Sequence, residues 1–201
     1  MTPIHQTRNE LLIVAKRHFA ARGYQGTSLA GVAAELGVTK QALLHHFKSK
    51  PLLYGACLDQ LNQDLLHLLF TAMEGTEEAE LQLERCLVAL SEFYLQDSAA
   101  AALVIGALID APGQAALSAA DVLPLQDFLE PLVALVQAVP RWRGGGFAEA
   151  LAVAVELLGA ICLQSAARSN LSIRFGETSV EQGRHLAARH ARDLVKDRLG
   201  G

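Results

Sequence analysis

Residues 27–50 constrain the fold of this chain more than any other stretch, and they read TSLAGVAAELGVTKQALLHHFKSK. Apolar residues at helical spacing predict a short helix in the first half of the stretch, and these are Leu29, Val32, Ala33 and Leu36. Gly37 follows, and glycine readily takes the left-handed conformation that ends a helix. Thr39 can cap a second helix, along which Leu43 and Phe47 continue the apolar face. The pattern is that of a helix-turn-helix.

The charge distribution along the chain indicates what this motif binds. Residues 1–51 carry seven Lys or Arg and two Glu, a net charge of +5. Residues 52–201 carry ten basic and 19 acidic side chains, a net charge of −9, so the overall value of −4 hides a strong asymmetry. A helix-turn-helix places its second helix in the major groove of DNA. We therefore expect a DNA-binding domain over residues 1–51 and a different task for residues 52–201.

The whole chain is predicted to be helical. Helical periodicity, together with start and stop residues, indicates further helices over residues 8–22, 49–73, 76–96, 97–109, 115–139, 147–169 and 179–199. Residues 141–146 contain three consecutive glycines and are predicted to form a mobile connection. No polar–apolar alternation with turn signals indicates a strand. The expected fold class is all-α, with a three-helix N-terminal module and a larger C-terminal helical domain.

Several other classes of protein are disfavoured. Cys57, Cys86 and Cys162 are far apart and odd in number, which argues against a disulfide framework or a zinc site and fits a reducing cytoplasm. The polar start of the chain does not resemble a signal peptide, and no uninterrupted apolar run reaches about 18 residues, so neither export nor a membrane partner is expected. No phosphate-binding glycine loop, Gly-x-Ser-x-Gly or His-Glu-x-x-His motif indicates an enzyme or a cofactor.

The N-terminal segment resembles the tetracycline-repressor (TetR) family of one-component bacterial regulators. The family motif is matched without gaps between residues 8 and 53, at Leu11, Leu12, Ala15, Phe19, Gly23, Tyr24, Thr27, Ser28, Val32, Ala33, Gly37, Val38, Leu43, His46, Phe47, Ser49, Lys50 and Leu53. Over residues 54–201 the resemblance is architectural only. It implies that a dimer binds an operator and that a small molecule in the C-terminal domain releases it. The chain departs from the family at Leu44, where an aromatic residue, most often tyrosine, usually touches the DNA backbone.

The motif and the resemblance together give the candidate DNA-binding residues, which are Thr27, Ser28, Thr39, Lys40, Gln41, His45, His46, Lys48 and Lys50. Lys40 and Gln41 lie in the first exposed turn of the second helix, and glutamine suits bidentate pairing with adenine. Lys50 resembles the family's phosphate contact, at a helix start that favours an anion. Thr27 and Thr39 are each predicted to cap a helix. His46 is expected to pack within the module rather than contact DNA.

The C-terminal domain gives weaker signals. A cavity between helices is expected to hold a lipophilic small molecule, and its candidate lining residues are His67, Phe70, Phe93, Tyr94, Phe128 and Gln164. For each of them, an ordinary core or surface position is the alternative. The helix over residues 147–169 is apolar on more than one face, so we expect one face to form a two-fold dimer. The candidate interface residues are Leu151, Ala154, Val155, Leu158 and Cys162; burial of both faces within one monomer is the alternative.

The sequence thus favours a transcriptional regulator: a homodimeric repressor of a near-palindromic operator, released by a small lipophilic effector. A ligand-independent nucleoid or architectural DNA-binding protein of the same fold is the alternative.

Overall fold

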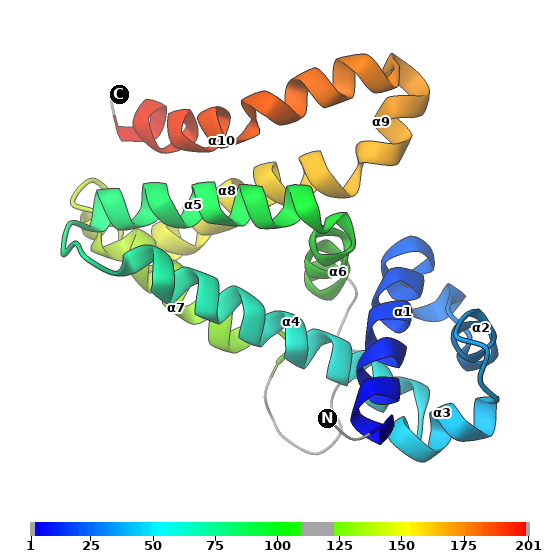
Figure 1. Cartoon of the computed structure of the whole chain (residues 1–201). Helices are drawn as coiled ribbons and strands as arrows, with labels where there is room; N and C mark the ends of the chain where they lie inside the picture. The colour runs from blue at the N-terminus through cyan, green and yellow to red at the C-terminus, as the bar shows by residue number, and fades with distance from the viewer. Residues whose placement is uncertain (1–2, 110–122, 200–201) are drawn as a thin grey trace.

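The helices predicted from periodicity form an all-α fold, shown in Figure 1 as a computed structural model that describes residues 3–109 and 123–199. Those residues contain no strand. In chain order the elements are α1 (Pro3–Gly26), α2 (Leu29–Glu35), α3 (Lys40–Phe47), α4 (Lys50–Met73), α5 (Ala79–Gln96), α6 (Ser98–Ile109), α7 (Gln126–Ala138), the 3₁₀ turn η1 (Arg143–Gly145), α8 (Gly146–Ala166), α9 (Arg168–Phe175) and α10 (Glu177–Leu199).

The turn between α2 and α3 forms as the sequence predicts. Gly37 has a φ of 71° and follows α2 in the left-handed conformation. Its N–H donates to the carbonyl of Ala34, and the N–H of Val38 donates to the carbonyl of Ala33. These two bonds define a Schellman motif, which satisfies carbonyls at the end of the helix. The Thr39 hydroxyl then accepts from the N–H of Ala42 and caps α3.

Helix α4 belongs to both halves of the molecule. Ser49 caps its N-terminus by accepting from Leu52 N–H, beside the three-helix module. Further along, an apolar stripe at helical spacing faces the core and consists of Leu58, Leu61, Leu65 and Leu69. One cluster of buried side chains runs from the module into the C-terminal domain. Because α4 is continuous, its core end and its N-terminus belong to one helix.

The C-terminal helices pack around α8. Helices α5 and α6 meet at 111°, and α8 lies against both of them and against α7 (Figure 1). The last helix, α10, runs along α5. The segment Arg143–Ala166 is long and apolar enough by composition to cross a membrane. Buried core helices have the same property, and α8 packs one face into this core.

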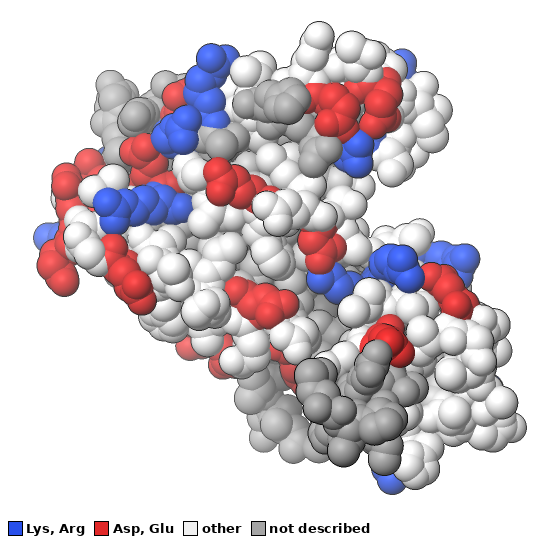
Figure 2. Space-filling view, in the orientation of Figure 1, with Lys and Arg blue, Asp and Glu red and all other residues white. Residues whose placement is uncertain are grey.

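Surface charge follows the division seen in the sequence. In Figure 2, which has the orientation of Figure 1, acidic side chains lie mainly over the C-terminal helices. The side formed by α2 and α3 carries few acidic groups on that face. This arrangement agrees with the net charge of −9 over residues 52–201 and +5 over residues 1–51.

Four boundary predictions need correction or restriction. Helix α5 begins at Ala79 rather than at Thr76, whose hydroxyl instead accepts from the N–H of Glu78 in the preceding turn. Residues 141–146 are not merely a connection, because Trp142 is buried and a 3₁₀ turn follows it. Helix α9 occupies a stretch for which no separate helix was predicted. The helix predicted over residues 115–139 is described only from residue 126 onward, as α7; its first part lies outside the described residues.

Candidate nucleic-acid interface

Helix α3 has one buried and one exposed face. Leu43 and Phe47 are buried against the module, as their spacing predicts. Lys40, Gln41 and His45 are exposed. The exposed face therefore offers an ammonium, an amide and an imidazole, which are groups that bind phosphates and base edges.

Lys50 is held in place at the start of α4. Its ammonium nitrogen lies 3.3 Å from the carbonyl oxygen of Gln25 and 4.5 Å from the ring centroid of Tyr24. The Tyr24 ring is itself fixed by Tyr54, with ring centroids 5.2 Å apart. Burial raises the pKa of the Tyr24 hydroxyl, so this ring stays neutral beneath the cation. A positioned ammonium at a helix N-terminus is suited to a phosphate group.

The two residues before α2 divide the roles that the sequence assigned to Thr27. Ser28 caps α2, because its hydroxyl accepts from the N–H of Gly31. Thr27 is buried, and its hydroxyl donates to the carbonyl of Gly23 at 2.9 Å. The prediction that Thr27 caps a helix is therefore wrong, and its hydroxyl is not free for a phosphate. The exposed Ser28 is the hydroxyl available on this side.

The last turn of α3 ends in a left-handed residue. Lys48 has a φ of 64°, and its side chain is exposed. His46 is partly buried, with its ring centroid 6.3 Å from that of Phe47. The guanidinium of Arg8 lies 5.1 Å from the Phe47 ring on the same part of the module. These contacts agree with a packing role for His46, while Lys48 and Arg8 add positive charge around the end of α3.

A polar network between α1 and α2 was not found from the sequence. His18 is buried, and its Nε2 lies 2.7 Å from a carboxylate oxygen of Glu35. Arg22 donates to the Nδ1 of His18 at 2.7 Å, and Arg17 pairs with Glu35 at 2.8 Å. Because Arg22 occupies Nδ1 as a donor, Nε2 carries the proton that His18 donates to Glu35. The network fixes α2, and through the tight turn α3, against α1.

The candidate pocket residues separate into two groups. Tyr94 and Phe128 are fully buried in the core, and Phe93 is partly buried beside Tyr94, with ring centroids 5.5 Å apart. His67 and Phe70 lie on the outer side of α4, where Phe70 is 51% exposed. The prediction that these two line an interior cavity is wrong, since neither falls on the inward stripe of α4. Gln164 is partly buried on α8.

The candidate dimer residues divide between the two faces of α8. Ala154, Leu158 and Cys162 are buried inside the monomer, so their assignment to a dimer surface is wrong. Leu151 and Val155 are 42% and 53% exposed. A helix that is apolar all round gives no periodicity from which the outward face can be chosen. The exposed apolar residues of α8 also include Leu163, which was not among the predicted interface residues.

Comparison with known proteins identifies the N-terminal module. Residues 11–57 match the model of the family described as bacterial regulatory proteins, tetR family. The N-terminal module therefore belongs to this family. The matched segment covers most of α1, all of α2 and α3, and the start of α4. It therefore contains both the exposed face of α3 and Lys50.

Relatives with curated functions match over part of their length. The chain is 32% identical over 96 residues to the HTH-type transcriptional activator FasR of Mycolicibacterium smegmatis. This match covers 48% of this chain and 44% of that protein. It is 37% identical over 75 residues to the HTH-type transcriptional regulator TtgR of Pseudomonas putida, which is 37% of this chain and 35% of that protein. The chain thus spans less than half the length of these curated relatives.

Solved structures resemble the fold over nearly the whole chain. A TetR-like transcriptional regulator from Rhodococcus sp. RHA1 has a TM-score of 0.64 at 18% identity, covering 96% of this chain and 95% of that one. AibR, solved with isovaleryl coenzyme A and operator DNA, has a TM-score of 0.60 at 17% identity over 78% of this chain and 84% of that one. At these identities the likeness concerns the fold alone.

Proposed function

We propose that the protein is a DNA-binding transcriptional repressor that acts as a homodimer and is released from its operator by a small molecule. Residues 1–51 form the DNA-binding domain, and residues 52–201 bind the effector and the second copy. The observation that carries this proposal is the exposed face of α3, with Lys40 and Gln41 in its first turn. It lies in the segment that matches the tetR family.

DNA contacts divide by chemistry in this proposal. Gln41 reads a base edge in the major groove, because an exposed amide can pair with adenine through two hydrogen bonds. Lys50 and Ser28 bind backbone phosphates from the starts of α4 and α2. Lys40, His45 and Lys48 add contacts from or beside α3. Phosphate contacts set affinity and register, while Gln41 contributes sequence preference.

A second copy of the chain covers the exposed apolar face of α8. This face consists of Leu151, Val155 and Leu163, which repeat every four to eight residues along the outside of the helix. Gly159 lies between them with no atom within 4 Å of an added Cβ, so close approach of another helix is sterically open. A two-fold dimer presents two copies of α3 to two half-sites about one DNA turn, roughly 34 Å, apart.

Effector binding is coupled to DNA binding through α4. The core end of α4 carries Leu61 and Leu65, and its N-terminus carries Lys50. A molecule that enters the core and favours another placement of α4 changes the separation of the two copies of α3. By linkage, such a molecule lowers operator affinity, and operator DNA lowers affinity for the molecule by the same factor.

The first experiment is a selection of sites from a random duplex library with the purified protein, followed by anisotropy titrations at several salt concentrations. A selected near-palindrome is expected. Lys50→Gln is expected to weaken binding to all sequences and to reduce the salt slope by about one. Gln41→Ala is expected to relax preference at one position in each half-site, at a cost of about 1–3 kcal/mol.

Arg85→Gln is the matched control, since it removes one exposed cation from α5, far from the module in sequence. It is expected to leave the salt slope unchanged. Weak binding that ignores sequence and all three substitutions contradicts the repressor. Sequence-independent binding that Lys50→Gln still weakens favours an architectural DNA-binding protein.

A further inference from the structure

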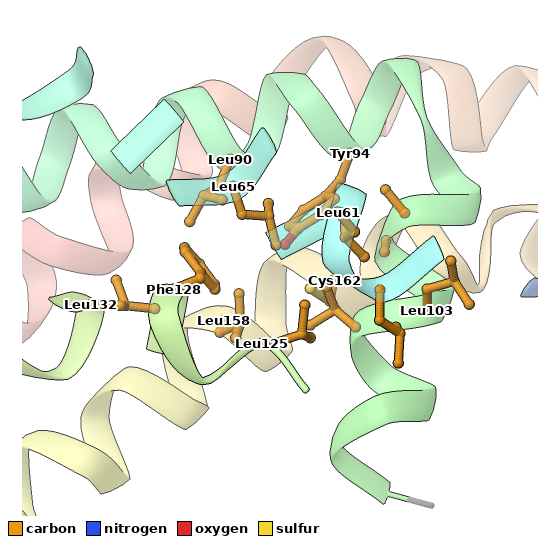
Figure 3. Packing of buried hydrophobic residues seen from close by; sticks show 14 of the residues in the cluster. Leu61, Leu65, Leu90, Tyr94, Leu103, Leu125, Phe128, Leu132, Leu158 and Cys162 are labelled. Atoms are coloured by element: carbon orange, nitrogen blue, oxygen red, sulfur yellow. The ribbon is translucent and has the colours of Figure 1, made fainter. Parts of the chain in front are cut away.

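The hydroxyl of Tyr94 is a polar group in an apolar core. Tyr94 projects from α5 into the buried cluster and has no exposed surface (Figure 3). In the described part of the chain, three buried side-chain nitrogen or oxygen atoms have no nitrogen or oxygen hydrogen-bond partner: Tyr94 Oη, Arg168 Nε and Ser172 Oγ. Of these, only Tyr94 belongs to the hydrophobic core. A phenylalanine at this position would fill the same space without burying a hydroxyl.

The buried cluster that contains Tyr94 is built from apolar side chains of several helices. Figure 3 shows Tyr94 within a cluster of buried side chains that also contains Leu61 and Leu65 from α4, Leu103 from α6, Phe128 from α7 and Leu158 from α8. Asn62 is the buried amide of this region, and both ends of it are occupied. It donates to Asp127 at 2.9 Å and accepts from the N–H of Phe128 at 3.2 Å. It is therefore no partner for Tyr94.

The hydroxyl remains a hydrogen-bond donor at any physiological pH. Burial raises the pKa of Tyr94 well above its ordinary value of 10, and the neighbouring Cys162 thiol raises it further. Burial also raises the pKa of Cys162 to about 12, so this group is a neutral thiol, and the hydrogen bond that Tyr94 can make to its sulfur is weak. The Tyr94 proton thus lacks a strong acceptor within the core.

We propose that Tyr94 is the polar anchor of the effector site, and that the effector is an uncharged, mainly apolar molecule whose single carbonyl or ether oxygen accepts the Tyr94 hydroxyl proton. This inference rests on the proposed function. It specifies the chemical class of the effector and identifies the Tyr94 hydroxyl as the group that recognises its oxygen. The surrounding leucine and phenylalanine side chains contribute affinity through burial of apolar surface, and Tyr94 contributes orientation and selectivity.

Charge is what this site excludes. Among the described residues, no aspartate, glutamate, lysine or arginine is buried. A carboxylate, phosphate or ammonium at Tyr94 would lose its hydration without gaining a counter-ion, which is strongly unfavourable. A molecule with an acid group is therefore rejected unless that group remains outside the core.

The test uses benzophenone as the probe, with diphenylmethane as a shape-matched compound that lacks the acceptor and 4-benzoylbenzoate as a charged one. Affinities for the full-length protein are measured by calorimetry and by thermal shift. Benzophenone is expected to bind about two- to tenfold more tightly than diphenylmethane, as one added neutral hydrogen bond implies. 4-Benzoylbenzoate is expected to bind more weakly than benzophenone. Irradiation of bound benzophenone is expected to label peptides of the cluster around Tyr94.

Tyr94→Phe retains the ring and is expected to bind both neutral compounds equally. Tyr54→Phe removes a hydroxyl from the N-terminal part of α4 and is expected to keep the selectivity of the unchanged protein. Failure of benzophenone to bind, equal binding of the two neutral compounds by the unchanged protein, or selectivity that survives in Tyr94→Phe overturns the inference. Operator affinity is recorded separately. Tyr94-dependent binding that leaves operator affinity unchanged supports this site and contradicts only the release step of the proposed function.

Discussion

The ammonium of Lys16 pairs with the carboxylate of Asp97, which ties α1 of the DNA-binding module to the junction of α5 and α6. The same aspartate caps α6, because its other carboxylate oxygen accepts from the N–H of Ala100 at 3.1 Å. The residues are 81 positions apart in the chain. One side chain thus holds the helix junction and the module together.

The two roles of Asp97 can be separated by substitution. Asp97→Asn keeps an acceptor for the cap but removes the charge, so it is expected to lower the free energy of unfolding by at most about 1 kcal/mol. Asp97→Ala removes both interactions and is expected to cost about 1–2 kcal/mol. Urea unfolding measures both values, and a double-mutant cycle with Lys16→Met isolates the pair. Equal losses for the Asn and Ala variants would show that the cap contributes nothing.

Acid sensitivity is expected from the network between α1 and α2. The hydrogen bond from His18, together with the charge of Arg17, holds the pKa of Glu35 below its ordinary value of 4.5. A carboxyl whose folded-state pKa is depressed contributes stability above its unfolded pKa, and this contribution disappears as the pH falls through the folded value. Relative to Glu35→Gln, the unchanged protein should therefore have the higher urea midpoint at pH 7. The difference between the two urea midpoints should shrink below about pH 4.5.

Glu77→Gln is the control for this measurement, since Glu77 is an exposed carboxylate in the turn before α5. Its midpoint is expected to follow that of the unchanged protein at every pH. A Glu35→Gln curve parallel to the unchanged one down to pH 3 would contradict a role for the ionised Glu35.

Replacement of Leu44 by tyrosine is expected to strengthen DNA binding. Leu44 is partly exposed on α3, between the buried Leu43 and the exposed His45. A tyrosine there adds a hydroxyl that can donate to a backbone phosphate, which is expected to increase operator affinity about two- to tenfold. Because the added group is neutral, the salt slope should not change. Anisotropy titrations at two salt concentrations check both statements. Leu44→Phe, which adds a ring without the hydroxyl, distinguishes the hydrogen bond from stacking.

The proposed dimer depends on the outward face of α8. Val155→Glu places a charge on that face and is expected to convert the dimer into a monomer, as measured by light scattering after size-exclusion chromatography. Phe70→Glu is the matched control, because Phe70 on α4 is 51% exposed and Val155 is 53% exposed. It is expected to leave the dimer intact. Dissociation by both variants, or by neither, would argue against an interface on α8.

Local sequence predicted the features that depend on neighbouring residues. The Schellman turn at Gly37 and the cap at Thr39 involve hydrogen bonds across no more than five positions, so the residue types alone indicate them. The assignment of a cap to Thr27 failed because Ser28, the next residue, has the same capping chemistry. Sequence alone does not decide between two adjacent hydroxyls.

Tertiary packing decided what the sequence left open. The apolar residues of α8 occupy all sides of the helix, so the division that buries Leu158 and exposes Val155 depends on where α5, α6 and α7 lie. The buried His18 pairs with Glu35 across 17 positions, and no local pattern indicates such a pair. Tyr94 was selected as a pocket residue, but its lack of a nitrogen or oxygen partner is visible only in the packed core.

The tight turn of the module gives a prediction that concerns backbone conformation alone. Gly37 has a φ of 71°, and an added Cβ would meet no atom within 4 Å. Gly37→Ala is therefore expected to lose about 1–2 kcal/mol of unfolding free energy from left-handed strain rather than from a clash. Gly55 also has open space around an added Cβ, but it lies inside α4 at a helical φ. Gly55→Ala is expected to gain about 0.4–1 kcal/mol. Urea unfolding of the two variants should give opposite signs, and a loss of similar size in both would exclude the conformational explanation.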